Sequence, residues 1–181
     1  MKKLAFVAVA ILCVQLYAPN AGAAPTSYMT VESSKQGVLK GDSPRPGFQD
    51  KTEVYSYAYA VNVVSGNRQH GPVKVVKRVG PATPQLFQAL VNNEILKSVV
   101  IDFIETNASG QEFVANTVRL GSARVIGIDQ GGASQETAAS AKHSSSVNNP
   151  TMETIAFLFE TIEIMNHNGK TSAVDSIPLR Q

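Results

Sequence analysis

The chain has little cysteine and no tryptophan, and its charges almost balance. Cys13 is the single cysteine. It lies in an apolar N-terminal stretch, so the remainder of the chain has no disulfide and must be stabilised by its core. Basic residues number 16 and acidic residues 14. Lys2 and Lys3 account for the excess, and a formally neutral remainder gives no electrostatic argument for nucleic acid or an anionic membrane.

Residues 1–23 have the three parts of a secretory signal peptide: the positive start, an apolar stretch over residues 4–17, and a small-residue cleavage site at residues 21–23. The apolar stretch is shorter than the roughly 20 residues of a membrane-spanning helix. Lipidation of Cys13 is the alternative, which the bulky Leu12 before it disfavours. We expect cleavage to leave residues 24–181 as one exported domain, periplasmic or secreted, without stable membrane insertion.

Residues 55–64, YSYAYAVNVV, alternate between bulky and small side chains. This two-residue period predicts a strand whose tyrosine and valine face packs on a core. Six further stretches have strand character, namely residues 27–31, 38–40, 72–79, 95–105, 111–128 and 152–165. Asn168 and Gly169 predict a two-residue hairpin turn before a last strand over residues 171–177. The chain is therefore expected to be mainly β, an antiparallel two-sheet barrel or sandwich.

One short helix is predicted over residues 81–94. Thr83 is the expected N-cap, Pro84 suits the first turn, and an apolar stripe follows. The stripe consists of Leu86, Phe87, Leu90 and Val91. A helix of two to three turns is marginal in water, so we expect it to pack on the sheets.

Residues 130–149 are almost wholly glycine, alanine, serine and polar residues. Such a segment cannot bury enough apolar area to offset the entropy of ordering it. We therefore expect a flexible loop inserted between two strands.

Catalytic and metal-binding patterns are missing from the sequence. The three histidines, His70, His143 and His167, are far apart, and no pair has the spacing of metal ligands on one helix face. Glu153, Glu160 and Glu163 share a predicted strand, but the two on one face are too far apart for an acid/base pair. No serine nucleophile motif and no phosphate-binding glycine loop occurs. We expect no catalytic residues, no metal and no cofactor, and favour a structural or binding role over an enzyme.

Three stretches occur in an order and spacing typical of one family. Residues 39–43, LKGDS, look like an I-K-G-E-S segment that precedes the alternating strand. Residues 73–90 look like a strand, a charged turn and an S-P-x-L-F helix start. The residues that carry this second match are Lys77, Arg78, Pro84, Leu86 and Phe87. Residues 150–155 with Phe157 and Phe159 look like a P-T-E-x-V-x-L-x-F strand. Together they resemble the Hcp family, the haemolysin co-regulated proteins of type VI secretion tubes.

The resemblance implies a compact barrel of two sheets with one helix, assembled as hexameric rings that stack into a tube. The implied partners are five further copies of the chain, other type VI secretion components, and small effector proteins in the lumen. In such a ring the tyrosine face of residues 55–64 would fill the barrel, and the small-residue face would accept the neighbouring layer.

The family's long loop after the alternating strand, which contacts the next ring, corresponds here to a short polar segment. Its residues are Ser65, Gly66, Asn67, Arg68, Gln69 and His70. We take them as the candidate ring-stacking loop, and expect ring formation to survive better than stacking because the loop is short. The signal peptide is a second departure from the family pattern. Tube subunits assemble in the cytoplasm and normally lack a signal peptide, so its presence here argues against a cytoplasmic tube.

Two other hypotheses remain open from the sequence. The chain could be an exported monomeric β-domain that binds a small ligand or a glycan, or a secreted hydrolase, although no residue is identified as its nucleophile. Oligomeric state separates the ring-forming hypothesis from the first of these.

Overall fold

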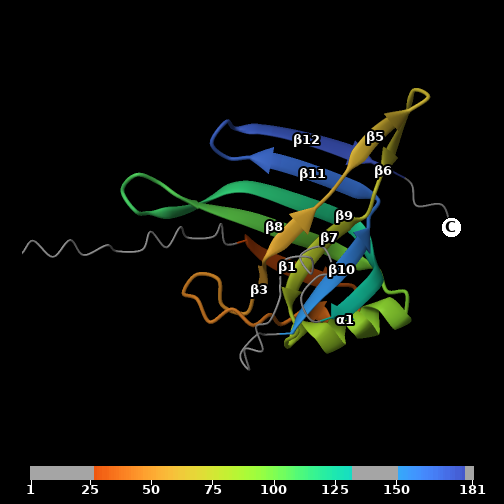
Figure 1. The fold of residues 1–181 in the computed structure, drawn as a ribbon, viewed down its shortest axis with the longest axis horizontal. Coiled ribbons are helices and arrows are strands. Elements are labelled where there is room, and N and C mark those ends of the chain that lie inside the picture. Colours follow the sequence, from red (N-terminus) through yellow and green to blue (C-terminus); the bar gives the residue numbers. More distant parts are fainter. Residues whose placement is uncertain (1–26, 132–150, 178–181) are drawn as a thin grey trace, which may run out of the picture.

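A computed structural model describes residues 27–131 and 151–177 of the protein. The predicted signal peptide, Cys13 and His143 lie outside the described residues, as does most of the predicted loop over residues 130–149. The described residues form antiparallel strands and one helix (Figure 1). The predicted fold class is therefore confirmed.

Apart from a separate two-stranded pair, β5 (Val61–Val64) and β6 (Asn67–His70), the strands divide into two sheets. The first sheet runs in the order β12, β11, β9, β8 and β1, and the short strands β2 and β3 pair with the outer edge of β1. Its members are β1 (Ser27–Ser33), β2 (Gly37–Val38), β3 (Thr52–Val54), β8 (Leu96–Thr106), β9 (Glu112–Gly131), β11 (Thr161–Asn166) and β12 (Thr171–Ser176). The second sheet runs in the order β9, β10, β7 and β4, and adds β4 (Ser56–Ala58), β7 (Val73–Arg78) and β10 (Met152–Leu158).

Two segments pass from one sheet to the other. The first half of β9 pairs with β8 and β11, and its second half pairs with β10 from Arg124 onward. Ser122, which lies between the halves, has a φ of 47° and bends the strand. On the opposite side, β3 pairs with β1, and β4, two residues further on, pairs with β7. The two layers form a sandwich, not a closed barrel.

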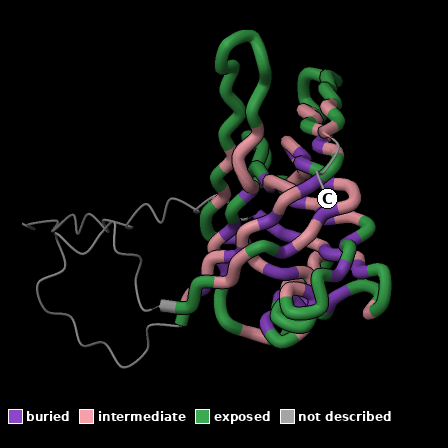
Figure 2. Tube along the Cα trace, turned by 90° about the vertical axis from the view of Figure 1, so that its right-hand side faces the viewer, coloured by how far each residue is buried: buried purple, intermediate pink, exposed green. Residues whose placement is uncertain are grey.

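The inward faces of both sheets supply one hydrophobic core. Alternation along β7 places Val73, Val75 and Lys77 inside, while Val76 is half-buried and Arg78 is exposed. The largest fully buried apolar side chains are Tyr28, Phe157, Met29, Leu86, Leu96, Ile101, Leu120 and Ile155. Figure 2 shows that buried residues concentrate in the body, whereas the projecting hairpins are mostly exposed.

Close packing explains why the LKGDS stretch has a glycine at position 41. The backbone of Lys51 runs so close to Gly41 that a Cβ there would collide with the Lys51 carbonyl group. The Gly41 N–H donates to the Asp50 carbonyl at 2.6 Å, which ties the turn-rich stretch onto itself.

Helix α1 (Ala82–Val91) follows β7 and covers one end of the sandwich. Its N-cap is Pro81, so the prediction of Thr83 as the cap is wrong; Thr83 lies inside the first turn, and its hydroxyl is used elsewhere. Leu86 is fully buried, but Phe87 and Val91 are each 56% exposed. The predicted stripe is therefore wider than the face that the sheets cover.

The alternating stretch over residues 55–64 is not one strand. It divides into β4 and β5 (Val61–Val64), because β4 pairs with β7 over three residues and the chain then leaves the sheet. Tyr57 packs edge-on against Phe103, with ring centroids 5.3 Å apart, and Tyr59 is half-buried against the core. Tyr55 is exposed, so the tyrosine face fills the core only in part.

The remaining predictions hold with shifted boundaries. The β8–β9 hairpin matches the predicted pair, and β10 and β11 split the predicted strand over residues 152–165 at Phe159 and Glu160. The turn between β11 and β12 contains four residues, not two, and Lys170 carries its positive φ. Gln130 belongs to β9 and not to the predicted loop.

Candidate assembly site

The candidate ring-stacking residues belong to a projecting β-hairpin. β5 pairs with β6 (Asn67–His70), and Ser65 and Gly66 form the turn with φ values of 51° and 78°. Two successive positive φ values match the twist of a two-residue hairpin. The predicted loop is thus the turn and the returning strand of what we call the β5–β6 hairpin, residues 61–70 (Figure 1). With four residues in each strand, the hairpin extends about 13 Å.

The sequence did not predict β5 as half of this projection, because its valines suit a buried strand. Val61, Val63 and Val64 are instead 49%, 73% and 48% exposed. Val61 and Val63 share one face of the hairpin and form an apolar surface that a neighbouring molecule could cover, while Val64 lies on the other face.

A carboxylate of the last strand holds the base of the β5–β6 hairpin. The Arg68 Nε atom lies 2.9 Å from Asp175 Oδ2, and His70 Nε2 lies 3.1 Å from the same oxygen. The Tyr59 hydroxyl contacts His70 Nδ1 at 2.5 Å. Burial, and secondarily the charge of Asp175, raise the pKa of Tyr59 above its ordinary value. We call Tyr59, Arg68, His70 and Asp175 the hairpin-base cluster.

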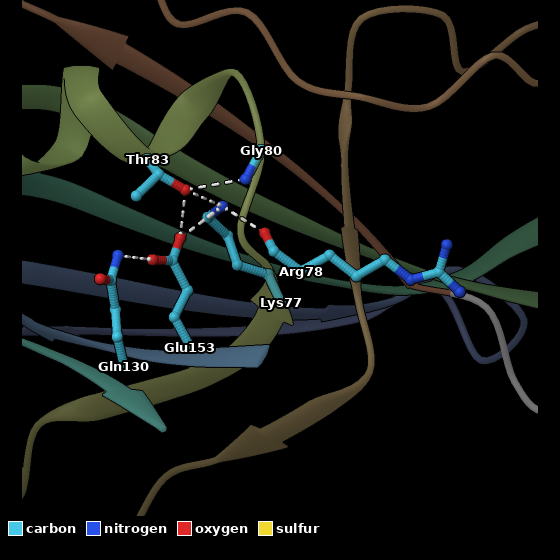
Figure 3. A network of polar contacts seen from close by, with 6 residues as sticks. All are labelled: Lys77, Arg78, Gly80, Thr83, Gln130 and Glu153. Carbon is cyan, nitrogen blue, oxygen red and sulfur yellow. Dashed lines mark hydrogen bonds and ion pairs between the residues drawn. The ribbon is translucent and has the colours of Figure 1, made fainter. Parts of the chain in front are cut away.

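A second polar cluster lies beneath α1, at the other end of the molecule (Figure 3). Lys77 Nζ lies 2.6 Å from Glu153 Oε1, and the two side chains are 1% and 0% exposed. Lys77 also donates to the Arg78 carbonyl at 2.8 Å and to the Thr83 hydroxyl at 3.2 Å. Each of the three ammonium hydrogens therefore has an acceptor.

The Glu153 carboxylate is equally well satisfied. The Thr83 hydroxyl donates to Oε1 at 2.6 Å, and Gln130 Nε2 donates to Oε2 at 2.8 Å. Burial raises the pKa of Glu153, but the hydrogen bonds from Lys77, Thr83 and Gln130 together outweigh burial, so this pKa lies below its ordinary value. We call Lys77, Thr83, Gln130 and Glu153 the buried polar cluster.

The buried polar cluster joins four elements. Lys77 comes from β7, Thr83 from α1, Gln130 from β9 and Glu153 from β10. A cavity of about 380 Å³ lies beside it, lined by Thr83, Pro84, Phe87, Leu90, Ile128 and Gln130. The side-chain polar groups of Lys77, Thr83 and Glu153 all bind partners within the protein, which indicates a structural role for the cluster.

The three glutamates of the predicted strand have different surroundings in the structure. Glu153 is paired with Lys77, Glu163 lies 3.8 Å from Arg119 on the sheet surface, and Glu160 is exposed. Among residues 27–131 and 151–177, no three of His, Cys, Asp and Glu gather as metal ligands. Within the same part of the chain, no helix is both long enough and apolar enough to span a membrane, and α1 has only 10 residues.

Two features of these clusters could not be read from the sequence. The alternation of residues 73–78 places Lys77 on the same face as Val73 and Val75, which indicates a buried lysine. The partner of Lys77, Glu153, is 76 residues away, so the pattern does not identify it. Asp175 has no such signal, because it lies in a polar strand 105 residues after His70.

Comparison with solved structures identifies this architecture. The structure of the secreted protein Hcp3 from Pseudomonas aeruginosa superposes with a TM-score of 0.70 at 23% identity, covering 87% of this chain and 100% of that one. A double mutant of Hcp1 from E. coli EAEC 042 superposes with a TM-score of 0.71 at 18% identity, covering 85% and 99%. At these identities the solved structures establish the fold alone.

The sequence comparisons establish the family. The family model described as type VI secretion system effector, Hcp, matches residues 28–165. A curated relative, the major exported protein of Pseudomonas aeruginosa, is 29% identical over 113 residues, which span 52% of this chain and 66% of that relative. The chain belongs to the Hcp family of type VI secretion proteins, as its LKGDS, helix-start and late-strand stretches predict.

Proposed function

We propose that this chain is the subunit of a homo-oligomeric ring, a hexamer by analogy with the Hcp tube, and that its rings stack through the β5–β6 hairpin. The observation that carries the proposal is the family match over residues 28–165, which begins in β1 and ends in β11. It includes strands of both sheets and the whole hairpin, and it ends before β12.

Strand edges support a head-to-tail contact between copies. In the described part of the chain, β12 pairs with β11 only and β4 pairs with β7 only, so each offers one unpaired edge. Ser56 and Ala58 give one face of β4 small side chains, which let a layer of the neighbouring copy approach that face closely. Two different edges on one subunit are what a closed ring requires, since each contact joins unlike surfaces.

The β5–β6 hairpin supports contact along the ring axis. It extends beyond the sandwich and carries the exposed side chains of Val61 and Val63 on one face. Burying such valines against a second ring removes apolar surface from water, which favours stacking. The candidate residues Ser65, Gly66, Asn67, Arg68, Gln69 and His70 form the end and return strand of this contact.

The test is the oligomeric state of residues 24–181 and of the full chain, measured by size-exclusion chromatography with light scattering. Negative-stain microscopy of the same fractions would show whether rings form and stack. We expect a mass six times that of the subunit. A clean monomer at micromolar concentration would overturn the proposal and favour the exported monomeric β-domain that binds a ligand or glycan.

We further propose that residues 1–23 direct export and are removed, and that the exported chain has no enzymatic activity. The curated relative is named a major exported protein, which supports export but not its route. Intact mass of the protein recovered from periplasm and from medium tests cleavage after Ala23, and an uncleaved N-terminus in both fractions would refute it.

A further inference from the structure

The β5–β6 hairpin has little support from the rest of the protein. Its two strands pair with each other and with no other strand of the described residues. Every residue from 61 to 69 is exposed, and only His70 is partly covered. A two-stranded hairpin with no packing partner is marginally stable in water, so something at its base must determine where it points.

That support comes from one side of β6. Arg68 and His70 are two residues apart, so their side chains lie on the same face of the strand. Both contact Oδ2 of Asp175, at 2.9 Å and 3.1 Å. The other oxygen of this carboxylate, Oδ1, accepts the N–H of Ser176 at 2.8 Å, which holds the Asp175 side chain in place.

The imidazole of His70 connects this carboxylate to the core. In the neutral ring, a proton on Nε2 donates to Asp175 while Nδ1 accepts from the Tyr59 hydroxyl, so one tautomer satisfies both contacts. The ring stacks on Tyr59 with centroids 6.2 Å apart and meets the buried Phe159 edge-on at 6.1 Å. The His70 side chain is only 7% exposed as a result.

We propose that Asp175 is the positioning residue of the β5–β6 hairpin: its carboxylate binds Arg68 and His70 together and thereby fixes the angle between the hairpin and the sandwich. β12, which carries Asp175, is paired with β11 along six residues and so provides a firm anchor. The proposal extends the assembly function and rests on it for its consequence, namely that a released hairpin would present its valines to the next ring in many orientations.

The test is hydrogen–deuterium exchange with mass spectrometry on the wild-type chain and Asp175→Asn, which keeps the side-chain shape but removes the charge. We expect amides of residues 61–70 to exchange about tenfold faster in the variant, because charge-assisted hydrogen bonds at the base are lost. Amides of β8, β9 and β10 should be unchanged. Asp175→Glu, which restores the charge, should recover part of the protection.

Asp129→Asn is the matched control, since Asp129 is an exposed carboxylate on β9 away from the hairpin. It should leave exchange in residues 61–70 unaltered. The double variant Arg68→Gln/Asp175→Asn should exchange no faster than Asp175→Asn alone, because both changes remove the same contact.

Unchanged exchange of residues 61–70 in Asp175→Asn would overturn the positioning role, and so would an equal acceleration throughout the protein. Light scattering on the same samples keeps the two proposals apart. A monomeric wild type with a loosened Asp175→Asn hairpin refutes assembly and retains the positioning residue. An assembled wild type with no change in exchange refutes the positioning residue alone.

Discussion

The two polar clusters use similar charges in different surroundings. In the buried polar cluster, the side chains of Lys77 and Glu153 are 1% and 0% exposed. In the hairpin-base cluster, those of Arg68 and Asp175 are 62% and 29% exposed. Water can replace the partners of the second pair but not those of the first. Breaking the buried pair therefore leaves a buried charge that nothing solvates. Breaking the exposed pair costs little free energy, and its main effect is that the orientation of the β5–β6 hairpin is no longer fixed.

The comparison indicates a division of roles. The buried polar cluster joins four elements, as the convergence of its side chains in Figure 3 illustrates, so we expect its disruption to weaken the whole sandwich. The hairpin-base cluster joins one projecting hairpin to one strand and determines local geometry. Stability and assembly are thus expected to respond to different substitutions.

The largest expected effect is that of Glu153→Gln. Removing one member of a buried ion pair costs about 3–5 kcal/mol, because the Lys77 ammonium remains buried without a counter-charge. Urea unfolding followed by circular dichroism measures this loss. Glu105→Gln, at an exposed carboxylate on β8, is the control and should change the unfolding free energy by less than about 0.5 kcal/mol.

The double variant Lys77→Met/Glu153→Leu sharpens the same prediction. Removing both charges together leaves neither unpaired, so we expect it to recover at least half of the stability lost in Glu153→Gln. A loss below about 1 kcal/mol in Glu153→Gln would show that the two clusters do not differ as proposed.

Acid should weaken the buried polar cluster selectively. The ordinary pKa of a glutamate is 4.5 and that of Glu153 in the folded protein is lower. Its stabilisation is therefore complete above about pH 4.5 and is lost as the pH falls through the folded-state pKa. Unfolding free energies measured below pH 4.5 should decline more steeply for the wild type than for Glu153→Gln. Parallel curves would contradict this assignment.

A smaller effect is expected from Asp175→Asn on global stability. The carboxylate is partly hydrated, so the unfolding free energy should fall by about 1 kcal/mol or less. The same urea experiment measures it beside Glu153→Gln. A loss as large as that of Glu153→Gln would mean that the hairpin base is part of the cooperative core.

The smallest effect on stability is expected from Val63→Ser. This side chain is 73% exposed, so the unfolding free energy should change by less than about 0.5 kcal/mol. If the hairpin stacks rings, the variant should form rings but shorter stacks in negative-stain images. Val38→Ser, the same change at a 64% exposed site on β2, tests whether the loss of any exposed valine has the same result. Unaltered stacks in Val63→Ser would remove the hairpin from the stacking contact.

Much of the fold was predictable because its signals are local. Alternation identified β7, β8, β9 and β10, and the helix start at residues 81–84 was visible from its prolines and threonine. The errors arose where the available pairing partner decides which residues join a sheet. The stretch over residues 55–64 alternates without interruption, yet β7 offers β4 a partner for three residues only, and the rest forms a hairpin in solvent. Phe87 and Val91 belong to an apolar stripe that the sheets do not cover.

The amino-acid sequence by itself determined the class of fold, the family, and the absence of disulfides, since these depend on residue types at short spacing. Tertiary structure alone decided that Lys77 meets Glu153 and that Asp175 meets Arg68 and His70. These partners come from distant strands, and their meeting depends on the registers of β10 against β7 and of β12 against β11. Register is the outcome of packing both sheets at once, which no local pattern of side chains encodes.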